Sequence, residues 1–257
     1  DTLVIESTYG ADPEADGVSY ESEIRRFAKA VTDVIERDGV ALVPTFALGR
    51  TQELLNIIAR LQETGRLPHV PVRTSGLGRA IYEVYRRFPD YMHPEANLRP
   101  LRGFGRVGDM WNPRKVKELL KRPSIIVATS GMMVENTPSA LIAQEMVRDK
   151  RHGIFFVGYL DPDTLGYKLL NGGPGTLLKF QLDRRPVEVA LEDIQWFYFS
   201  AHAPRQALKA IVERLRPRRN VIFVHGDPEA VDWMCRNAAN GCMSFAPAAG
   251  ESISLGG

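Results

Sequence analysis

Cysteine is scarce in this sequence, and so is any excess of charge of one sign. The 257 residues include two cysteines, Cys235 and Cys242, which are too few for a disulfide framework and lack the paired spacing of a structural zinc site. They favour a reducing, cytoplasmic location. The 33 basic and 31 acidic side chains leave a net charge of +2, too small for binding driven by bulk charge. A site for a polyanion must therefore be local.

Long apolar runs are also missing. The longest, such as residues 153–160, have the size of a strand, whereas a membrane helix needs roughly 18 apolar residues, so we expect no membrane partner. The chain opens with Asp1 and passes directly into the apolar residues 2–5. This beginning predicts that the chain is the C-terminal part of a longer protein.

The composition that remains is that of a globular protein, with 44% hydrophobic and 25% charged residues, which excludes a disordered chain. Short apolar runs alternate with apolar residues at helical spacing, as is typical of parallel strands buried on both faces. We therefore predict an α/β fold. The expected strands are 2–5, 40–43, 70–72, 124–127, 154–157, 187–190, 196–199 and 221–224. The expected helices are 24–35, 54–61, 81–88 and 207–215, with a short one near 116–120 inside an irregular stretch, 89–123.

Three of the predicted strands end in similar loops, at 45–50, 74–79 and 129–133. Each places hydroxyl groups, a glycine or both where open α/β sheets bind ligands and where helix N-termini offer free N–H groups to phosphate. One such loop is an ordinary connector, but three on one edge of a sheet favour a crevice that binds phosphate. The candidate phosphate-binding residues are Thr45, Arg50, Ser75, Arg79, Ser130 and Gly131.

A carboxylate and two histidines form a second group of candidates. Glu6, His202 and His225 each follow a predicted strand, and a proline suited to a first helical turn follows each histidine, Pro204 and Pro228. If the strands are neighbours in one sheet, the three side chains converge at its C-terminal edge. A lone histidine is more often a structural group than a ligand, and the repeated arrangement leaves the functional and structural interpretations equally supported.

The other three histidines have no such context. His69 and His93 lie beside prolines in predicted loops, and His152 lies in the charged turn 148–152. We expect all three on the solvated surface.

Five motifs carry a resemblance to a known family. They are Glu6-Ser-Thr-Tyr-Gly10, Pro44-Thr-Phe-Ala-Leu-Gly-Arg50, Thr129-Ser-Gly-Met-Met133, Phe199-Ser-Ala-His202 and Val224-His-Gly226. In these motifs, and in their order over nearly the whole chain, the sequence resembles the β-CASP branch of the metallo-β-lactamase superfamily, which includes RNase J and the endonuclease subunit of the cleavage and polyadenylation factor. The resemblance implies that Glu6 is the acidic residue of the first β-CASP motif, that His202 is the histidine of the second, and that His225 is a zinc ligand. A histidine at the position of His202 is typical of members that act on RNA.

The same resemblance implies a domain organisation. Residues 11–195 would form a β-CASP domain, inserted into a metallo-β-lactamase domain whose last pieces are residues 1–10 and 196–257. The family's HxHxDH motif, which supplies most ligands for two zinc ions, belongs upstream of Asp1. Because catalytic zinc takes about three protein ligands, we expect this chain alone to hold at most a partial zinc site and to be inactive.

The function that the resemblance implies is hydrolysis of RNA phosphodiester bonds by the intact protein, with zinc activating hydroxide and His202, oriented by Glu6, transferring a proton or stabilising the transition state. The expected partners are RNA and the upstream metallo-β-lactamase segment, and a homodimer stays open. A function of another class also stays open, that of a non-catalytic RNA-binding or scaffolding paralogue. Degraded ligands in the upstream motif would favour that alternative.

Overall fold

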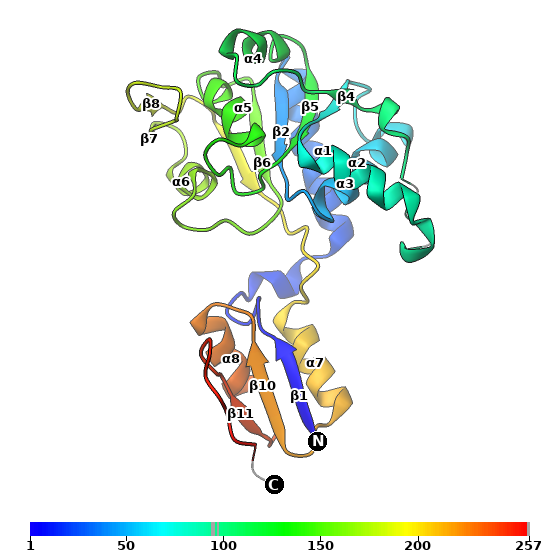
Figure 1. Cartoon of the computed structure of the whole chain (residues 1–257), viewed down its shortest axis with the longest axis vertical. Helices are drawn as coiled ribbons and strands as arrows, with labels where there is room; N and C mark the ends of the chain where they lie inside the picture. Colours follow the sequence, from blue (N-terminus) through cyan, green and yellow to red (C-terminus); the bar gives the residue numbers. More distant parts are fainter. Residues whose placement is uncertain (94–95, 97, 256–257) are drawn as a thin grey trace. The chain divides into compact units, whose positions relative to one another are not determined.

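The computed structural model describes residues 1–93, 96 and 98–255, and it has the predicted α/β fold (Figure 1). The chain forms two compact units: the smaller unit is Asp1–Tyr20 with Ser200–Gly257, and the larger unit is Glu21–Phe199. These divisions differ from the expected boundaries at residues 10 and 195. The 3-10 helix η1 (Glu14–Gly17) packs against α7 (Arg205–Leu215), which places it in the smaller unit.

The larger unit is built on a six-stranded parallel sheet with the strand order β4-β3-β5-β2-β6-β9. Its strands are β2 (Val40–Pro44), β3 (Val72–Thr74), β4 (Gly105–Arg106), β5 (Ser124–Ala128), β6 (Gly153–Phe156) and β9 (Asp193–Trp196). The central strands β2, β5 and β6 are buried along their whole length. This burial explains why each reads as a continuous apolar run in the sequence.

Helices cover both faces of this sheet. The pattern is visible in β2, where Ala41 and Val43 pack into one apolar cluster and Val40 and Leu42 into another on the opposite face. The helices on the first face are α1 (Tyr20–Glu36), α2 (Arg50–Glu63) and α3 (Leu77–Arg87). Those on the second face are α4 (Pro113–Leu119), α5 (Pro138–Met146) and α6 (Leu165–Gly172). The larger unit is therefore a doubly wound, three-layered α/β body.

Three predicted strands of the larger unit were wrong in part. The strand predicted at 70–72 is β3, which begins only at Val72. The prediction of a strand at 187–190 corresponds to β8 (Val187–Glu188), which pairs with β7 (Leu177–Leu178) in a small antiparallel ribbon. The prediction at 196–199 is misplaced, because β9 ends at Trp196. Phe197 and Phe199 are buried for another reason: their rings lie 5.5 and 5.6 Å from that of Phe27 on α1, edge to face.

The stretch 89–123, predicted to be irregular, contains short elements. They are η2 (Pro89–Tyr91), η3 (Leu101–Gly103), β4 and α4, the last close to the predicted helix at 116–120. Residues 94, 95 and 97 of this stretch lie outside the described part of the chain. No helix among the described residues is both long enough and apolar enough to cross a membrane.

The smaller unit has a three-stranded parallel sheet in the order β1-β10-β11, formed by β1 (Thr2–Glu6), β10 (Asn220–Val224) and β11 (Met243–Phe245). Ile5 and its register partner Phe223 pack under α7 and α8 (Pro228–Ala238), so both helices cover one face. Val4 belongs to the opposite face, in register with Ile222 and through it with Phe245. The side chain of Val4 is exposed, and those of Ile222 and Phe245 are half-buried.

One histidine is not where the sequence predicts it. His152 is buried, with 2% of its surface exposed, although we expected it on the solvated surface. Its Nδ1 accepts a hydrogen bond of 3.1 Å from the backbone N–H of Val40, at the start of β2. The charged residues around it in the sequence hide this role, because the turn exposes Arg151 while its neighbour His152 points inward. His69 and His93 are exposed, as expected.

The buried His152 makes the larger unit sensitive to acid. Burial lowers the pKa of His152 and outweighs the attraction of Asp149, which raises it. The unfolded chain therefore binds the proton more readily than the folded one, so the free energy of unfolding is highest above the ordinary histidine pKa of about 6.5 and falls as the pH drops through the lowered value. We predict that His152→Asn, whose Oδ1 can accept the same hydrogen bond, flattens this dependence. Urea unfolding at several pH values measures how the free energy of unfolding depends on pH. The exposed control His69→Asn should show the same pH dependence as wild type. If His152→Asn also shows the wild-type dependence, His152 is not the cause of the acid sensitivity.

Candidate functional site

The loops that follow β1 and β10 are held against one another by close backbone contacts. The N–H of Ser7 donates to the carbonyl of His225 at 3.1 Å. A Cβ on Gly226 would lie 2.9 Å from the carbonyl oxygen of Ser7, and a Cβ on Gly10 would lie 2.2 Å from that of Ala230 in α8. Only glycine permits both approaches. His225 itself has a left-handed backbone, with φ of 53°, which is uncommon for a residue other than glycine and directs its ring out of the strand.

His202 comes from a loop and not from a strand of this sheet. We expected the three candidates to converge if the strands that they follow are neighbours in one sheet. This condition holds for Glu6 on β1 and His225 on β10 but not for His202, which lies three residues before α7. Asp16 fixes the start of that helix, because its carboxylate accepts from the Nε of Arg205 at 2.8 Å and from the N–H of Gln206 at 3.0 Å. The loop that carries His202 is thereby anchored within the smaller unit.

Glu6 is held by hydrogen bonds to both carboxylate oxygens. The N–H of Thr8 donates to Oε2 at 2.8 Å, and the N–H of Ala203 donates to Oε1 at 3.3 Å. Partial burial alone would raise the pKa of Glu6, but the hydroxyl and N–H of Thr8, the charge of His202 and the N–H of Ala203 together outweigh it, so that pKa lies below its ordinary value. Glu6 is therefore ionised at neutral pH.

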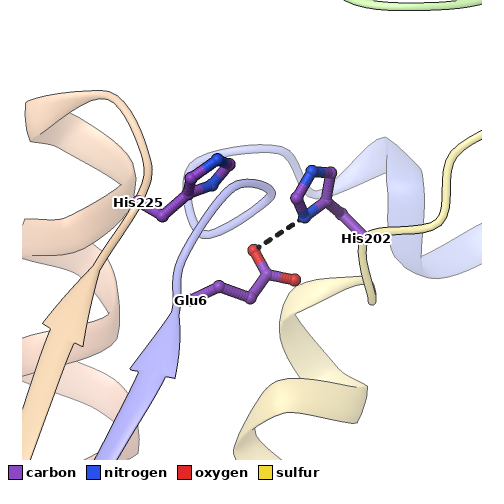
Figure 2. Close-up of side chains that lie close together, drawn as sticks. All are labelled: Glu6, His202 and His225. Carbon is purple, nitrogen blue, oxygen red and sulfur yellow. Dashed lines mark ion pairs between the residues drawn. The ribbon is translucent and has the colours of Figure 1, made fainter. Parts of the chain in front are cut away.

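Glu6, His202 and His225 meet at one end of the smaller sheet (Figure 2). Nδ1 of His202 lies 3.3 Å from Oε2 of Glu6, and one ligand atom from each of the three side chains lies within 4.8 Å of the others. The two imidazole rings are stacked, with centroids 5.0 Å apart and planes inclined by 26°. Both histidines are exposed, so the group opens to solvent.

Sequence reasoning missed the side chain of Thr8. Its Oγ1 lies 3.2 Å from Nδ1 of His202 and 3.1 Å from Nδ1 of His225, and it donates to the carbonyl of His225 at 3.3 Å. Thr8 is part of the quoted motif that begins at Glu6, but a hydroxyl in a turn gives no signal of its own, because threonine is common where a strand ends.

The group contains donors that suit zinc, which binds imidazole nitrogen and carboxylate oxygen. The Nδ1 atoms of both histidines face inward, toward Glu6 and Thr8, as happens when a histidine binds metal through Nε2 and hydrogen-bonds through its other nitrogen. Both oxygens of Glu6 already accept hydrogen bonds. The residues present therefore fit one zinc ligand, His225, beside a histidine paired with a carboxylate.

The three predicted phosphate loops lie side by side in the larger unit. They follow β3, β5 and β2, which are adjacent parallel strands, so all three are on the C-terminal edge of one sheet. Two of them lead into helices, since Gly49 precedes α2 and Gly76 precedes α3, both with positive φ. The three loops therefore lie on one edge of a sheet, which the prediction of a phosphate-binding crevice required.

The candidate side chains of these loops differ in what they offer. Thr45 is fully buried and hydrogen-bonded to Thr51 at 2.9 Å, so its hydroxyl holds the loop together. Arg50 is paired with Glu53. Arg79 donates to the carbonyls of Phe104 and Gly105 at 3.4 and 3.2 Å, and burial, followed by the charge of Arg106, lowers its pKa.

The small residues of these loops mostly shape the backbone. Oγ of Ser130 accepts from the N–H of Met132 at 3.3 Å, and a Cβ on Gly131 would lie 3.0 Å from the ring and N–H of Phe46. Ser75 is 98% buried, and its Oγ has no hydrogen-bond partner among the described residues. Phosphate binding by these loops stays a prediction for all six candidates, Thr45, Arg50, Ser75, Arg79, Ser130 and Gly131.

The fold and this site define a known class of protein. Residues 51–169 match the Beta-Casp domain, and residues 186–241 match the Zn-dependent metallo-hydrolase RNA specificity domain, which begins in the larger unit and contains His202 and His225. The chain belongs to the β-CASP branch of the metallo-β-lactamase superfamily, as the motifs predicted.

Several relatives are similar to this chain over most of its length. The transcription termination factor FttA of Methanocaldococcus jannaschii is 30% identical over 240 residues, an RNase of Saccharolobus solfataricus is 31% identical over 228, and an RNase J-like protein of M. jannaschii is 28% identical over 227. Each alignment covers 88% of this chain but only 37%, 42% and 52% of the respective relative. The chain therefore spans about half of the relatives' length or less.

Proposed function

We propose that this chain is the β-CASP and C-terminal portion of a longer, zinc-dependent ribonuclease that hydrolyses RNA phosphodiester bonds. The observation that carries the proposal is the meeting of a carboxylate-paired histidine, His202, with a second histidine, His225, at the open end of the smaller sheet. The family supports it, since one matching domain is described as a zinc-dependent metallo-hydrolase RNA specificity domain and two relatives are named as RNases or RNase J-like.

Each residue of the site has a distinct part in this proposal. Zinc, when bound, supplies an activated water and stabilises charge on the phosphoryl oxygens. His225 is the residue of this chain that holds it. His202 moves a proton at the leaving oxygen through its outward Nε2, and Glu6 keeps its Nδ1 protonated and its ring in place.

The proposed partner of the smaller unit is the metallo-β-lactamase segment that precedes Asp1 in the longer protein. Its sheet has one face covered by α7 and α8 and another on which Val4 is 59% exposed. A parallel sheet is normally covered on both faces, and the preceding segment is the chain that enters β1. The same segment is proposed to bring the remaining zinc ligands. Its HxHxDH motif, if intact, supports the enzyme, and a degraded motif supports the non-catalytic alternative.

The proposed RNA path runs along the strand-end loops of the larger unit. The two candidate cations differ in availability: Arg79 has carbonyl partners, whereas Arg50 must leave Glu53 to bind a phosphate. We expect Arg50→Ala combined with Arg79→Ala to flatten the slope of log affinity against log salt concentration by about one to one and a half units, at about 0.7 per phosphate contact on single-stranded nucleic acid. Fluorescence titrations of the full-length protein with single-stranded RNA at several salt concentrations measure it.

The control for this experiment is the pair Arg218 and Arg219, which is exposed in the turn between α7 and β10. Replacing both by alanine removes the same charge and should leave the slope nearly unchanged. If this pair flattens the slope and the Arg50 and Arg79 pair does not, the RNA path lies away from the strand-end loops.

A further inference from the structure

We propose that Thr8 is a positioning residue whose single hydroxyl fixes both histidines of the site with the proton on Nδ1. This proposal rests on the proposed function for its purpose, since a protonated Nδ1 leaves Nε2 of His225 free to bind zinc. The position of the hydrogen on each ring is inferred from the hydrogen-bond geometry alone. Oγ1 of Thr8 lies 3.2 Å from Nδ1 of His202 and 3.1 Å from Nδ1 of His225.

The proton on His202 follows from its neighbour Glu6. An ionised carboxylate only accepts hydrogen bonds, and Oε2 of Glu6 lies 3.3 Å from Nδ1 of His202. That Nδ1 must carry a hydrogen to make a favourable contact. The hydrogen can be shared with Oγ1 of Thr8, which is at nearly the same distance.

The hydrogen on Nδ1 of His225 follows from the number of hydrogen bonds that the Thr8 hydroxyl can make. A hydroxyl has one hydrogen to donate and two lone pairs that accept. Two acceptors compete for that one hydrogen: the carbonyl of His225, at 3.3 Å, and the carboxylate of Glu6, whose pKa the Thr8 hydroxyl lowers. Neither choice uses a lone pair of Oγ1. Both lone pairs of Oγ1 then face the two Nδ1 atoms. This arrangement satisfies all three groups only if each Nδ1 carries a hydrogen.

The backbone of Thr8 also takes part in the site. Its N–H donates to Oε2 of Glu6 at 2.8 Å, so the residue that orients the two rings also orients the carboxylate that pairs with one of them. The stacking of the two rings, inclined by 26°, is consistent with a shared anchor. If the Thr8 hydroxyl instead donated to Nδ1 of His225, the hydrogen of that ring would move to Nε2 and block metal binding there.

The consequence is measurable in the full-length protein as a change in zinc affinity. Groups that hydrogen-bond the second nitrogen of a zinc-binding histidine contribute about 10- to 100-fold in affinity. Thr8→Val, which keeps the shape and removes the hydroxyl, should weaken zinc binding by roughly that factor, and Thr8→Ser, which keeps the hydroxyl, should restore most of it. The matched control is Thr2→Val, on the strand β1 that leads to Thr8, because the hydroxyl of Thr2 contacts Asn220 and no histidine. Competition with a chromophoric chelator measures the affinity of each variant.

A second readout needs no zinc and no activity. The sequence has five histidines, and long-range ¹H–¹⁵N spectra of zinc-free, histidine-labelled protein assign the protonated nitrogen of each ring. In spectra recorded at alkaline pH, we expect hydrogen on Nδ1 of His202 and His225 in wild type and in Thr8→Ser. In Thr8→Val, or in Thr8→Ala if the valine variant does not fold, we expect His225 to lose this preference while His202 keeps it through Glu6.

The proposal is overturned if wild-type His225 carries its hydrogen on Nε2, or if the serine variant loses as much zinc affinity as the valine variant. These failures differ from a failure of the proposed function. If His225→Ala keeps full zinc while the ring spectra behave as expected, Thr8 still orients the histidines but His225 is not a zinc ligand.

Discussion

Replacing His202 by alanine in the full-length protein should slow the chemical step of RNA cleavage by roughly 10²- to 10⁴-fold, the range for a lost general acid, while zinc content stays nearly unchanged. The reason is the geometry of the pair: His202 is tied through Nδ1 to Glu6 and presents its other nitrogen to solvent. Single-turnover cleavage of a labelled RNA, with metal analysis of the same sample, measures both quantities.

The companion variant His225→Ala should lose metal as well as activity, because His225 is the residue that we assign to zinc. His69→Ala, an exposed histidine in the larger unit, is the matched control and should change neither. Full zinc and similar activity in both site variants would show that the two roles are assigned wrongly.

This chain by itself should bind zinc weakly and should not cleave RNA. Among the described residues, the one group suited to a metal is Glu6, His202 and His225, and Glu6 and His202 are engaged with each other. One free imidazole cannot hold zinc tightly where about three protein ligands are needed. Atomic spectroscopy after dialysis gives the zinc stoichiometry, and incubation with labelled RNA tests turnover.

Joining the upstream segment to the same chain should restore both properties, which makes the longer protein the control for this experiment. Stoichiometric zinc together with turnover in the isolated chain would contradict the incomplete ligand set.

The central strands of the larger sheet could be predicted from the sequence because they are buried on both faces. Runs such as 40–43 and 124–127 are continuously apolar and coincide with β2 and β5. The same criterion failed at 196–199, since Phe197 and Phe199 are equally apolar but serve the packing of Phe27. An apolar run indicates that a segment is buried. It does not distinguish a buried strand from a buried segment that has no regular secondary structure.

The site could be predicted in part for a similar reason. Glu6 and His225 end neighbouring parallel strands, and strand ends are recognisable in a sequence. His202 lies in the loop before α7, and Asp16 anchors the start of that helix. With His202 in this place, the hydroxyl of Thr8 lies between the two histidine rings. Contacts of this kind join residues far apart in the chain, so no local sequence pattern predicts them.

The central claim is that this site belongs to an enzyme that cleaves RNA and not to a scaffold that only binds it. The most direct test is incubation of the full-length protein with end-labelled single-stranded RNA, with zinc, with a chelator, and with zinc restored, followed by separation of the products. We predict cleavage that the chelator abolishes and zinc restores, and that His202→Ala suppresses in both conditions that contain zinc. RNA that is bound but stays intact in the presence of zinc would contradict the account.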